Sequence, residues 1–347
     1  MTANREVPSP GAGWAQPLAA PIVARPASAT LRWPAGPRLS DIRSQYRIIE
    51  SGAGWVERTG RGRLRVDGAD RVAFLQALVT NDLTALGPAR GVYAAYLTPQ
   101  GRLVADLTVY DRGDHLLADV PAALAGSLLT KLDALVFSED VRISDVSASI
   151  VAFGVMGRQA ESVVRQTTFF AVPTDVASHP AFDVFVPRES RAEAIAALEA
   201  AGARSVSEAL ADLLRIEAGR PAFGPDMDDQ TIPLEAGLLD RAISLTKGCY
   251  VGQEVIVRVL HRGGGRVARR LVTLAFDPAL ETPPAAGAVL VVDGREAGRV
   301  TSAAWSPGAG RVVALGYLTR DTAEPGRQVT TSVDGRDTAG RVVAFAG

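Results

Sequence analysis

The chain has 347 residues, of which 47% are hydrophobic, and its formal net charge at pH 7 is −1. This length and composition allow two or three domains with sizeable cores. The balanced charge argues against a dedicated nucleic-acid binder, because such proteins usually have a strongly basic domain. The sequence contains no uninterrupted apolar run of about 18 residues, so a transmembrane helix is not expected. We therefore expect neither a membrane partner nor direct binding to a nucleic acid.

Cysteine and histidine are scarce. Cys249 is the only cysteine, which excludes an intramolecular disulfide and a metal or cluster site built from paired cysteines of this chain. The three histidines are scattered, so we expect no self-contained metal site. The absence of a secretory apolar segment agrees with a cytoplasmic location.

The first 40 residues are predicted to be a disordered extension. They are rich in Ala, Pro, Gly and Arg, and their seven prolines forbid a long helix. Glu6 is the only acid before Asp41. An acid-poor segment that carries arginines is also compatible with a transit peptide, although it lacks a clear amphipathic period.

Residues 41–265 are predicted to mix helices and strands, with the folded part beginning near Tyr46. An alternating strand over 63–66 precedes a helix over 71–78, where the apolar spacing becomes helical. A hairpin turn at Pro99–Gly101 joins two strand-like runs. These runs cover 91–97 and 103–110, and we predict further helices over 121–136, 193–201 and 207–218, with a subdivision near 145–205.

Residues 266–347 have a different sequence pattern. Short Val-rich runs are separated by Asp-Gly and Pro-Gly pairs, as at Asp293-Gly294, Pro307-Gly308 and Asp334-Gly335. Many short strands with such turn signals are typical of an antiparallel barrel or sandwich. We therefore predict a C-terminal β-barrel.

The octet Lys-Gly-Cys-Tyr-Val-Gly-Gln-Glu at 247–254 contains the only cysteine. An ammonium group near a thiol favours the thiolate, so Lys247 could activate Cys249. Gly248 and Gly252 allow positive φ and a close approach of a ligand to the backbone. Cys249 could then be a nucleophile, a metal or cluster ligand, or a redox contact. The alternative is an inert, buried cysteine, which is the commoner case.

This octet resembles the signature of the YgfZ family. Weaker motifs around it resemble both YgfZ and the wider T-protein (aminomethyltransferase) superfamily, and the likeness extends from about residue 50 to the C-terminus. They are Thr80-Asn81-Asp82, Thr98–Arg102, Arg215–Gly219, Ile232–Leu238 and His261-Arg262-Gly263. The resemblance implies an α+β protein with a T-protein-like folate-binding fold in two parts and a C-terminal antiparallel β-barrel. The parts would form a ring-like arrangement with tetrahydrofolate, or a one-carbon derivative, in its central channel.

The resemblance also implies folate contacts. Arg215 matches an arginine that reaches the folate tail, and a guanidinium suits a carboxylate. Tyr93 matches an aromatic residue near the pterin, and Asp106 matches an acid near the folate nitrogens. Gly248 and Gly252 would let the backbone approach the ligand. The structural alternatives are a solvated helix arginine, ordinary strand packing and a turn cap.

Two departures from the T-protein pattern argue against aminomethyl transfer. The superfamily typically carries two adjacent Asp residues where this chain has Ala105 and Asp106, so the missing carboxylate could be the catalytic one. The T-protein also has a Tyr-Thr-Gly-Glu segment whose Glu contacts the pterin, and residues 169–186 contain no such sequence.

The resemblance to YgfZ therefore implies a tetrahydrofolate-binding accessory protein for the assembly or maintenance of iron–sulfur clusters, including those of tRNA-modifying enzymes. On this hypothesis Cys249 and Lys247 carry the function, and the partners are iron–sulfur enzymes or cluster-assembly proteins. The alternatives are a folate-dependent aminomethyltransferase of glycine cleavage or a related one-carbon transferase, and a folate-sensing regulator. A basic run from Arg258 to Arg270 is either a solvated face or a contact for an anionic partner.

Overall fold

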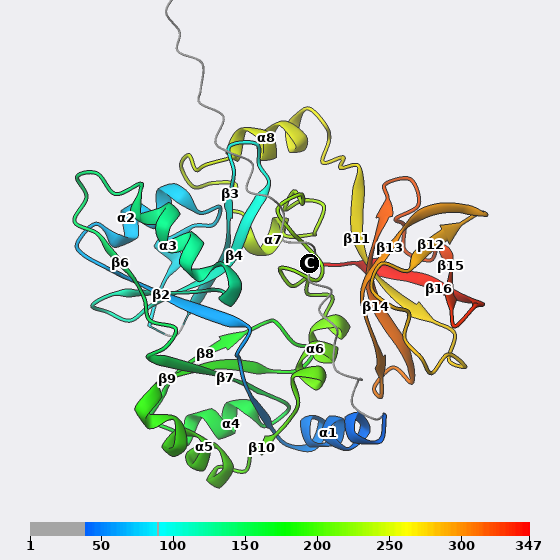
Figure 1. The fold of residues 1–347 in the computed structure, drawn as a ribbon, viewed down its shortest axis with the longest axis horizontal. Helices are drawn as coiled ribbons and strands as arrows, with labels where there is room; N and C mark the ends of the chain where they lie inside the picture. The colour runs from blue at the N-terminus through cyan, green and yellow to red at the C-terminus, as the bar shows by residue number, and fades with distance from the viewer. Residues whose placement is uncertain (1–38, 89) are drawn as a thin grey trace, which may run out of the picture. The chain divides into compact units, whose positions relative to one another are not determined.

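The computed structural model describes residues 39–88 and 90–347 (Figure 1). The predicted extension, residues 1–40, and the suggested transit peptide lie almost wholly outside the described residues. The first described element is helix α1 (Leu39–Ser51), so the folded part begins earlier than the expected start near Tyr46. Ile42, Tyr46 and Ile49 are buried at helical spacing, which is the apolar stripe that the proline-rich flank obscured.

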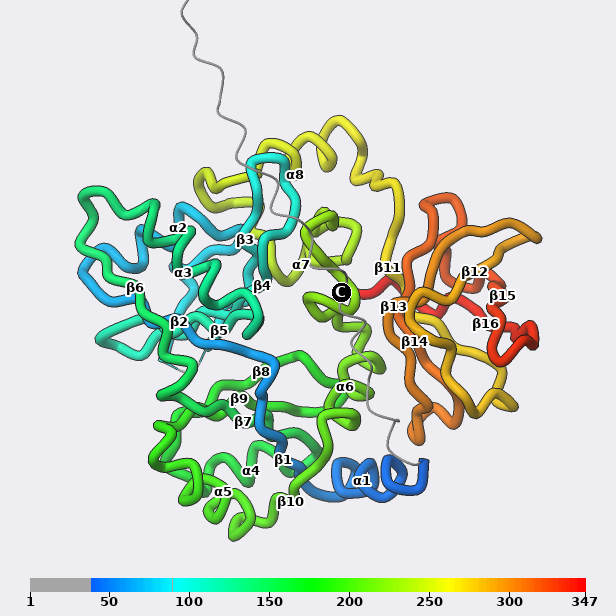
Figure 2. The backbone as a smooth tube through the Cα atoms, viewed as in Figure 1, coloured from blue at the N-terminus to red at the C-terminus, as the bar shows by residue number. Residues whose placement is uncertain are grey.

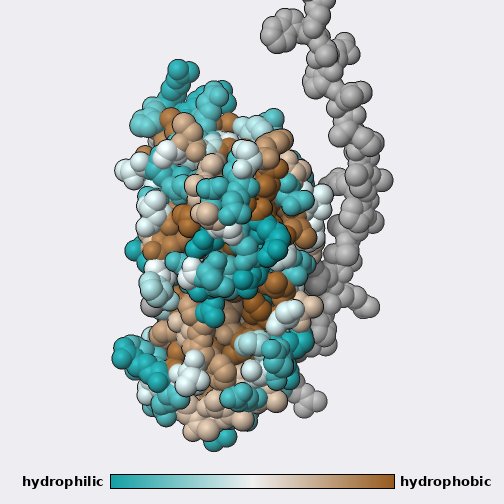
Figure 3. All heavy atoms as spheres, turned by 90° about the vertical axis from the view of Figure 1, so that its left-hand side faces the viewer, coloured by the Kyte–Doolittle hydropathy of each residue, from teal (hydrophilic) through white to brown (hydrophobic). Residues whose placement is uncertain are grey.

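A five-stranded antiparallel sheet carries the first half of the candidate site. Its strands in spatial order are β3 (Gly91–Leu97), β4 (Leu103–Asp111), β5 (Leu116–Pro121), β2 (Arg61–Asp67) and β6 (Arg142–Asp145). Helices α2 (Arg71–Leu78) and α3 (Ala125–Asp133) follow β2 and β5 in the chain, and their apolar residues share one core with the sheet. The face of the molecule in Figure 3 mixes hydrophilic and apolar residues, as an ordinary protein surface does.

A second five-stranded sheet carries the other half. Its spatial order is β10 (Arg204–Ser205), β1 (Gly54–Glu57), β7 (Ile150–Met156), β9 (Ala181–Pro187) and β8 (Phe170–Thr174). Its core includes residues of α4 (Ala160–Arg165) and α5 (Arg191–Ala200). Strand β1 pairs in parallel with β10 and antiparallel with β7. A small apolar cluster that includes Tyr110 of β4 and Phe185 of β9 joins the two sheets.

Helix α6 (Glu208–Glu217) leads from the second sheet towards the C-terminal part of the chain. Ser207 accepts a hydrogen bond from the amide of Leu210 at its start, as an N-cap does. The segment after α6 contains the short helix α7 (Leu239–Ala242) and helix α8 (Gln253–His261). Figure 1 shows α8 beside the hairpin of β3 and β4, and apolar residues of this segment share a core with that hairpin.

The C-terminal strands form a closed antiparallel barrel. Around the barrel they are β11 (Arg269–Phe276), β14 (Arg311–Thr319), β13 (Arg295–Ser306), β12 (Val289–Val292), β15 (Gln328–Val333) and β16 (Arg336–Phe345). Asp293 and Asp334 have positive φ before a glycine, which is the hairpin geometry that Asp-Gly pairs favour. Figure 2 follows the chain through these strands to its C-terminus. The predicted α+β class with a C-terminal barrel is confirmed.

Candidate functional site

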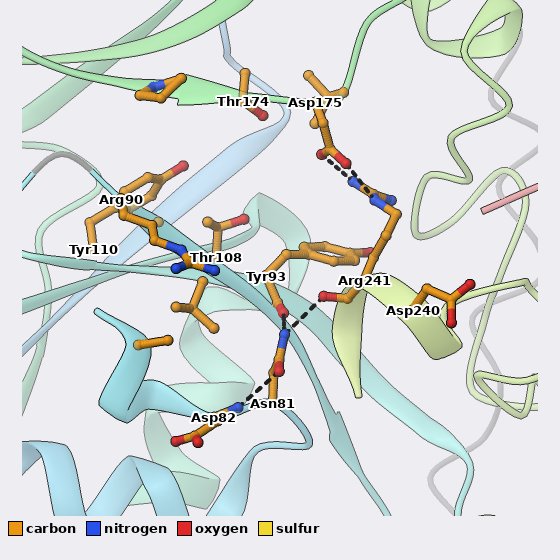
Figure 4. A pocket seen from close by; sticks show the side chains of 15 residues that line it. Asn81, Asp82, Arg90, Tyr93, Thr108, Tyr110, Thr174, Asp175, Asp240 and Arg241 are labelled. Carbon is orange, nitrogen blue, oxygen red and sulfur yellow. Dashed lines mark hydrogen bonds and ion pairs between the residues drawn. The ribbon is translucent and has the colours of Figure 1, made fainter. Parts of the chain in front are cut away.

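A cavity of about 590 Å³ lies where strands β3 and β4, the end of β8 and helix α7 meet (Figure 4). Its wall combines aromatic rings, hydroxyls and charged groups. The polar and aromatic lining residues are Asn81, Asp82, Arg90, Tyr93, Thr108, Tyr110, Thr174, Asp175, Asp240 and Arg241. Of the predicted site residues, this cavity contains Tyr93.

An ion pair closes one side of the cavity. Nε and Nη2 of Arg241 donate to Asp175, at 2.8 and 2.6 Å, and Arg220 lies 3.1 Å from the same carboxylate. Partial burial works against the charge of Asp175, but the hydrogen bonds and charge of Arg241 lower the pKa of Asp175 overall. The guanidinium of Arg241 also lies 4.8 Å from the centre of the Tyr93 ring, within range of a cation–π contact.

Asn81 holds together the two elements that carry Tyr93 and Arg241. Its amide donates to the backbone oxygen of Tyr93 and to that of Arg241, at 2.8 Å each (Figure 4). The Asn side chain therefore ties strand β3 to helix α7. This contact gives Asn81, within the Thr-Asn-Asp motif, a structural function.

Asp106 lies behind Tyr93 and does not line the cavity. Its carboxylate accepts a hydrogen bond from the Tyr93 hydroxyl at 3.2 Å and pairs with Arg61 at 2.9 Å. Burial, together with the negative charge of Asp106, raises the pKa of Tyr93 well above its ordinary value. Tyr93 is therefore a neutral phenol whose proton is directed to Asp106.

The pleat of β4 separates Ala105 from Asp106. Ala105 is fully buried within the apolar core shared with α2 and α3. Asp106 points to the other face of the sheet, towards Tyr93 and Arg61. The carboxylate that this chain lacks would thus lie in the apolar core, and the one that it retains lies next to the cavity.

Arg215 does not reach the cavity, because all five of its N–H groups are used internally. They bind Asp212, Asp226, the hydroxyl of Ser302 and the backbone oxygen of Arg220. Burial disfavours the charge, yet the two carboxylates raise the pKa of Arg215. The structure therefore favours a structural function over the predicted contact with the folate tail. Arg215 links α6 to strand β13.

Lys247 is held by the C-terminal end of helix α2. Its ammonium donates to the backbone oxygens of Gln76, Val79 and Asn81, at 2.5, 2.6 and 3.0 Å. Partial burial lowers the pKa of Lys247 to about 8. No hydrogen bond in the described part of the chain joins Lys247 to Cys249. The geometry therefore gives no support to the expectation that this lysine activates the thiol.

Cys249 is exposed, so it is not the buried cysteine of the alternative interpretation. Gly252 explains why the loop can follow this course. Its φ is +82°, and a Cβ there would lie 2.5 Å from the backbone oxygen of Thr98 in the β3–β4 turn. A Cβ on Gly248 would meet nothing within 4 Å. Neither glycine lines the cavity, so the structure gives no support to their predicted contact with a ligand.

The predicted basic run divides into two groups. Arg269 pairs with Glu235, and Arg270 lies over the ring of Phe345. Arg258, Arg262 and Arg266 are exposed and form no ion pair with any other described residue.

Sequence reasoning missed Asp175, Arg241 and Arg61. Asp175 lies within the stretch that lacks Tyr-Thr-Gly-Glu, and it nevertheless supplies a carboxylate to the cavity wall. Its partner Arg241 comes from a four-residue helix with no periodic signal of its own. Only the tertiary fold brings these residues together, so a pattern search along the chain has nothing to detect.

The described residues offer neither a metal site nor a membrane-spanning helix. In the ranges 39–88 and 90–347, no group of three or more His, Cys, Asp or Glu side chains is placed to hold a metal ion. No helix in those ranges is both long and apolar enough to cross a membrane.

Comparisons with known proteins agree on one superfamily. Residues 28–179 match the GCVT N-terminal domain, and residues 269–346 match the glycine cleavage T-protein C-terminal barrel domain. The chain is 27% identical over 331 residues to an aminomethyltransferase of Nostoc sp., covering 88% of this chain and 87% of that protein. It is 28% identical over 340 residues to an aminomethyltransferase of Geobacillus kaustophilus, covering 90% and 91%.

A further relative and a solved structure extend this likeness. A putative chloroplastic transferase of Arabidopsis thaliana is 27% identical over 308 residues, covering 82% of this chain and 70% of that protein. The crystal structure of the glycine cleavage system aminomethyltransferase T from Bartonella henselae superposes with a TM-score of 0.77. It is 21% identical and covers 87% of this chain and 88% of that chain, which shows a shared fold.

Proposed function

We propose that this chain, a member of the T-protein superfamily with both its N-terminal domain and its C-terminal barrel, binds tetrahydrofolate in the cavity between β3, β8 and α7. The observation that carries the proposal is the cavity itself. Its volume of about 590 Å³ lies within the range of small-molecule sites. It would hold the folate, or a one-carbon derivative of it, as a cofactor.

The cavity residues fit this ligand chemically. The rings of Tyr93 and Tyr110 offer faces on which a flat heterocycle can pack. The carboxylate of Asp240 can accept hydrogen bonds from ring nitrogens, and the guanidinium of Arg90 suits a carboxylate tail. When bound, the folate supplies nitrogen atoms that carry a one-carbon unit. The chain's own residues bind it, orient it and limit its contact with water.

The first candidate activity is folate-dependent transfer of an aminomethyl or other one-carbon group. It is supported by relatives named aminomethyltransferase that align with most of this chain. Asp106 lies directly behind the cavity wall, where its carboxylate accepts a hydrogen bond from the Tyr93 hydroxyl. The loss of the neighbouring acid at Ala105 does not oppose transfer, because that position faces the apolar core.

The second candidate activity is the accessory function in iron–sulfur cluster assembly or maintenance, in the cytoplasm, with iron–sulfur enzymes or assembly proteins as partners. The observation that favours it is the octet loop. Lys247 and Gly252 anchor this loop on α2 and on the β3–β4 turn, and Cys249 remains exposed between them. In addition, the carboxylate of Asp106, which transfer chemistry would use, is already bound by Arg61.

Titration with tetrahydrofolate tests the binding proposal. We expect wild-type protein to bind and Arg241→Ala to bind at least about tenfold more weakly, because Tyr93 and Asp175 lose their shared partner. Arg336→Ala, on the exposed end of the barrel, is the control and should bind like wild type. Wild-type protein that does not bind the folate would overturn the proposal.

A rescue experiment separates the two activities. In cells that lack this protein, we would return wild type or Cys249→Ala and measure a methylthio-modified tRNA nucleoside together with glycine cleavage. Rescue of the nucleoside by wild type alone would establish the accessory function. Rescue of glycine cleavage by both proteins would establish the transferase and remove any function from the thiol.

A further inference from the structure

Two tyrosines of the cavity are attached to one buried carboxylate by a continuous series of contacts. Tyr93 and Tyr110 both line the cavity (Figure 4). The Tyr93 hydroxyl donates to Asp106 at 3.2 Å, and the Tyr110 hydroxyl donates to Asp183 at 2.7 Å. Each tyrosine is thus held from behind by its own buried carboxylate.

Each of these carboxylates is paired with a different arginine. Asp106 lies 2.9 Å from Arg61, and Asp183 lies 2.7 Å from Arg58. Burial disfavours both guanidinium charges, but the surrounding carboxylates raise the pKa of Arg58 and of Arg61 overall. Both arginines are therefore charged at neutral pH.

The two arginines meet at Asp119. Arg58 and Arg61 both bind its Oδ2 atom, at 3.0 and 3.1 Å, and Arg61 also donates to its backbone oxygen at 2.8 Å. Asp119 is fully buried in strand β5. Its other oxygen, Oδ1, has no hydrogen-bond partner among the described residues.

The series crosses from one sheet to the other. Tyr93, Asp106 and Asp119 belong to the sheet of β3, β4 and β5, whereas Asp183 belongs to β9 of the second sheet. A buried ionic network costs desolvation free energy, and well-packed apolar side chains often serve stability as well or better. A network that holds two cavity-lining tyrosines is thus better explained by what it positions.

From this geometry we propose that Asp119 is a positioning residue. It couples Tyr93 to Tyr110 through Arg61 and Arg58, and so sets the spacing of the two rings that line the cavity from the neighbouring strands β3 and β4. The proposal rests on the tetrahydrofolate site above for its ligand. The coupling itself is a property of the free protein.

The first test needs no ligand. Ring-labelled tyrosine resonances are recorded for wild type, Tyr93→Phe and Tyr110→Phe, each with and without Asp119→Asn. With Asp119 present, Tyr93→Phe should shift the Tyr110 resonance. With Asp119→Asn it should leave that resonance in place. An equal shift in both backgrounds would overturn the proposal.

The second test is a double-mutant cycle on tetrahydrofolate affinity. With Asp119 present, the double Phe variant should deviate by about threefold or more from the product of the two single effects. In the Asp119→Asn background the effects of the two single Phe substitutions should multiply. Asp119→Asn itself should lower the affinity for tetrahydrofolate about tenfold relative to wild type. If the two single effects multiply when Asp119 is present, the proposed coupling is wrong. A wild type that binds no folate would instead refute the ligand and leave the resonance test to decide the coupling.

Two further variants separate positioning from stability. Asp226→Asn removes another buried carboxylate, whose partners Arg215 and Ser302 do not belong to the network. It should lower stability and leave the Tyr93–Tyr110 coupling intact, and loss of the coupling there would contradict the proposal. Arg61→Lys keeps the positive charge but loses the guanidinium that binds Asp106 and Asp119 at the same time. It should therefore also uncouple the tyrosines, and it replaces Asp119→Asn in these tests if that variant does not fold.

Discussion

Lys247 and Cys249 are neighbours in the sequence motif but have opposite surroundings. The Lys247 ammonium is directed inward to three backbone oxygens at the end of α2, and Cys249 is exposed. Carbonyl groups at a helix C-terminus carry partial negative charge and suit a cation. The lysine therefore acts as an anchor for the loop that presents the thiol.

Lys247→Met should destabilise the fold, because three backbone oxygens lose a charged donor. We expect the free energy of unfolding to fall by about 2 kcal/mol in denaturant titrations. Cys249→Ala is the matched control in the same loop and should change stability by less than about 0.5 kcal/mol. Equal stabilities of the two variants would contradict the anchoring function.

Asp175 gives a prediction about pH. Arg241 lowers the pKa of Asp175 below its ordinary 3.8, so the folded state holds this carboxylate more strongly in its charged form. Its contribution to stability is therefore fully present above about pH 4 and is lost as pH falls through the lowered pKa. Acid unfolding of wild type and Asp175→Asn measures this contribution. The difference between their free energies of unfolding should narrow below about pH 4. A gap independent of pH would exclude the ion pair.

At the scale of elements, the hairpin of β3 and β4 and the octet loop support each other. Gly252 lies under the backbone of Thr98, and a Cβ on Gly101 would lie 2.8 Å from the Val255 side chain. Both glycines have positive φ. The octet thus contains a glycine that the packing of two elements requires, in addition to the exposed cysteine.

Gly252→Ala should cost about 1–3 kcal/mol, because a Cβ would clash with Thr98 and the positive φ would be strained. Thermal and denaturant unfolding measure this cost. Gly248→Ala is the control from the same octet, since its Cβ would meet open space, and it should unfold like wild type. A tolerated Gly252→Ala would mean that the loop does not pack on the hairpin.

Local patterns in the sequence predicted several of the elements, although not helix α1, and they were insufficient for the site. Strand β3 and helix α2 were predicted with their observed bounds, since alternation and helical spacing are properties of neighbouring residues. The Arg241–Asp175 pair and the position of Ala105 depend on which sheet face meets which distant element. The contacts of Arg215 could not be predicted for the same reason, because its acceptors Asp212, Arg220, Asp226 and Ser302 come from separate segments of the chain.

At the scale of the whole molecule, Arg215 joins the barrel to the rest of the chain. It binds Asp226, which also accepts hydrogen bonds from Thr301 and Ser302 of strand β13. Around it, Ile216 of α6 shares an apolar cluster with Leu271 and Leu315 of the barrel. Ionic and apolar contacts together make one cooperative junction.

Arg215→Met should leave Asp226 buried without its cation, at a cost of about 3–5 kcal/mol. We expect the unfolding curves of barrel and N-terminal probes to separate, as seen by the fluorescence of Trp305 against that of Trp55. Tetrahydrofolate affinity measured on the folded variant should remain that of wild type. A selective loss of affinity at unchanged stability would return Arg215 to the ligand site.

The long-range pairing of strand β1 has a consequence for the folding of this protein during its synthesis. Gly54 pairs with Arg204, so the second sheet cannot be completed until some 150 further residues have been synthesised. Such distant pairings slow folding, whereas the barrel is built wholly from consecutive strands between 269 and 345. During translation β1 must therefore wait, with its edges unpaired, for most of the time that a ribosome needs to reach α6. Chaperone dependence is expected to concentrate in this early interval.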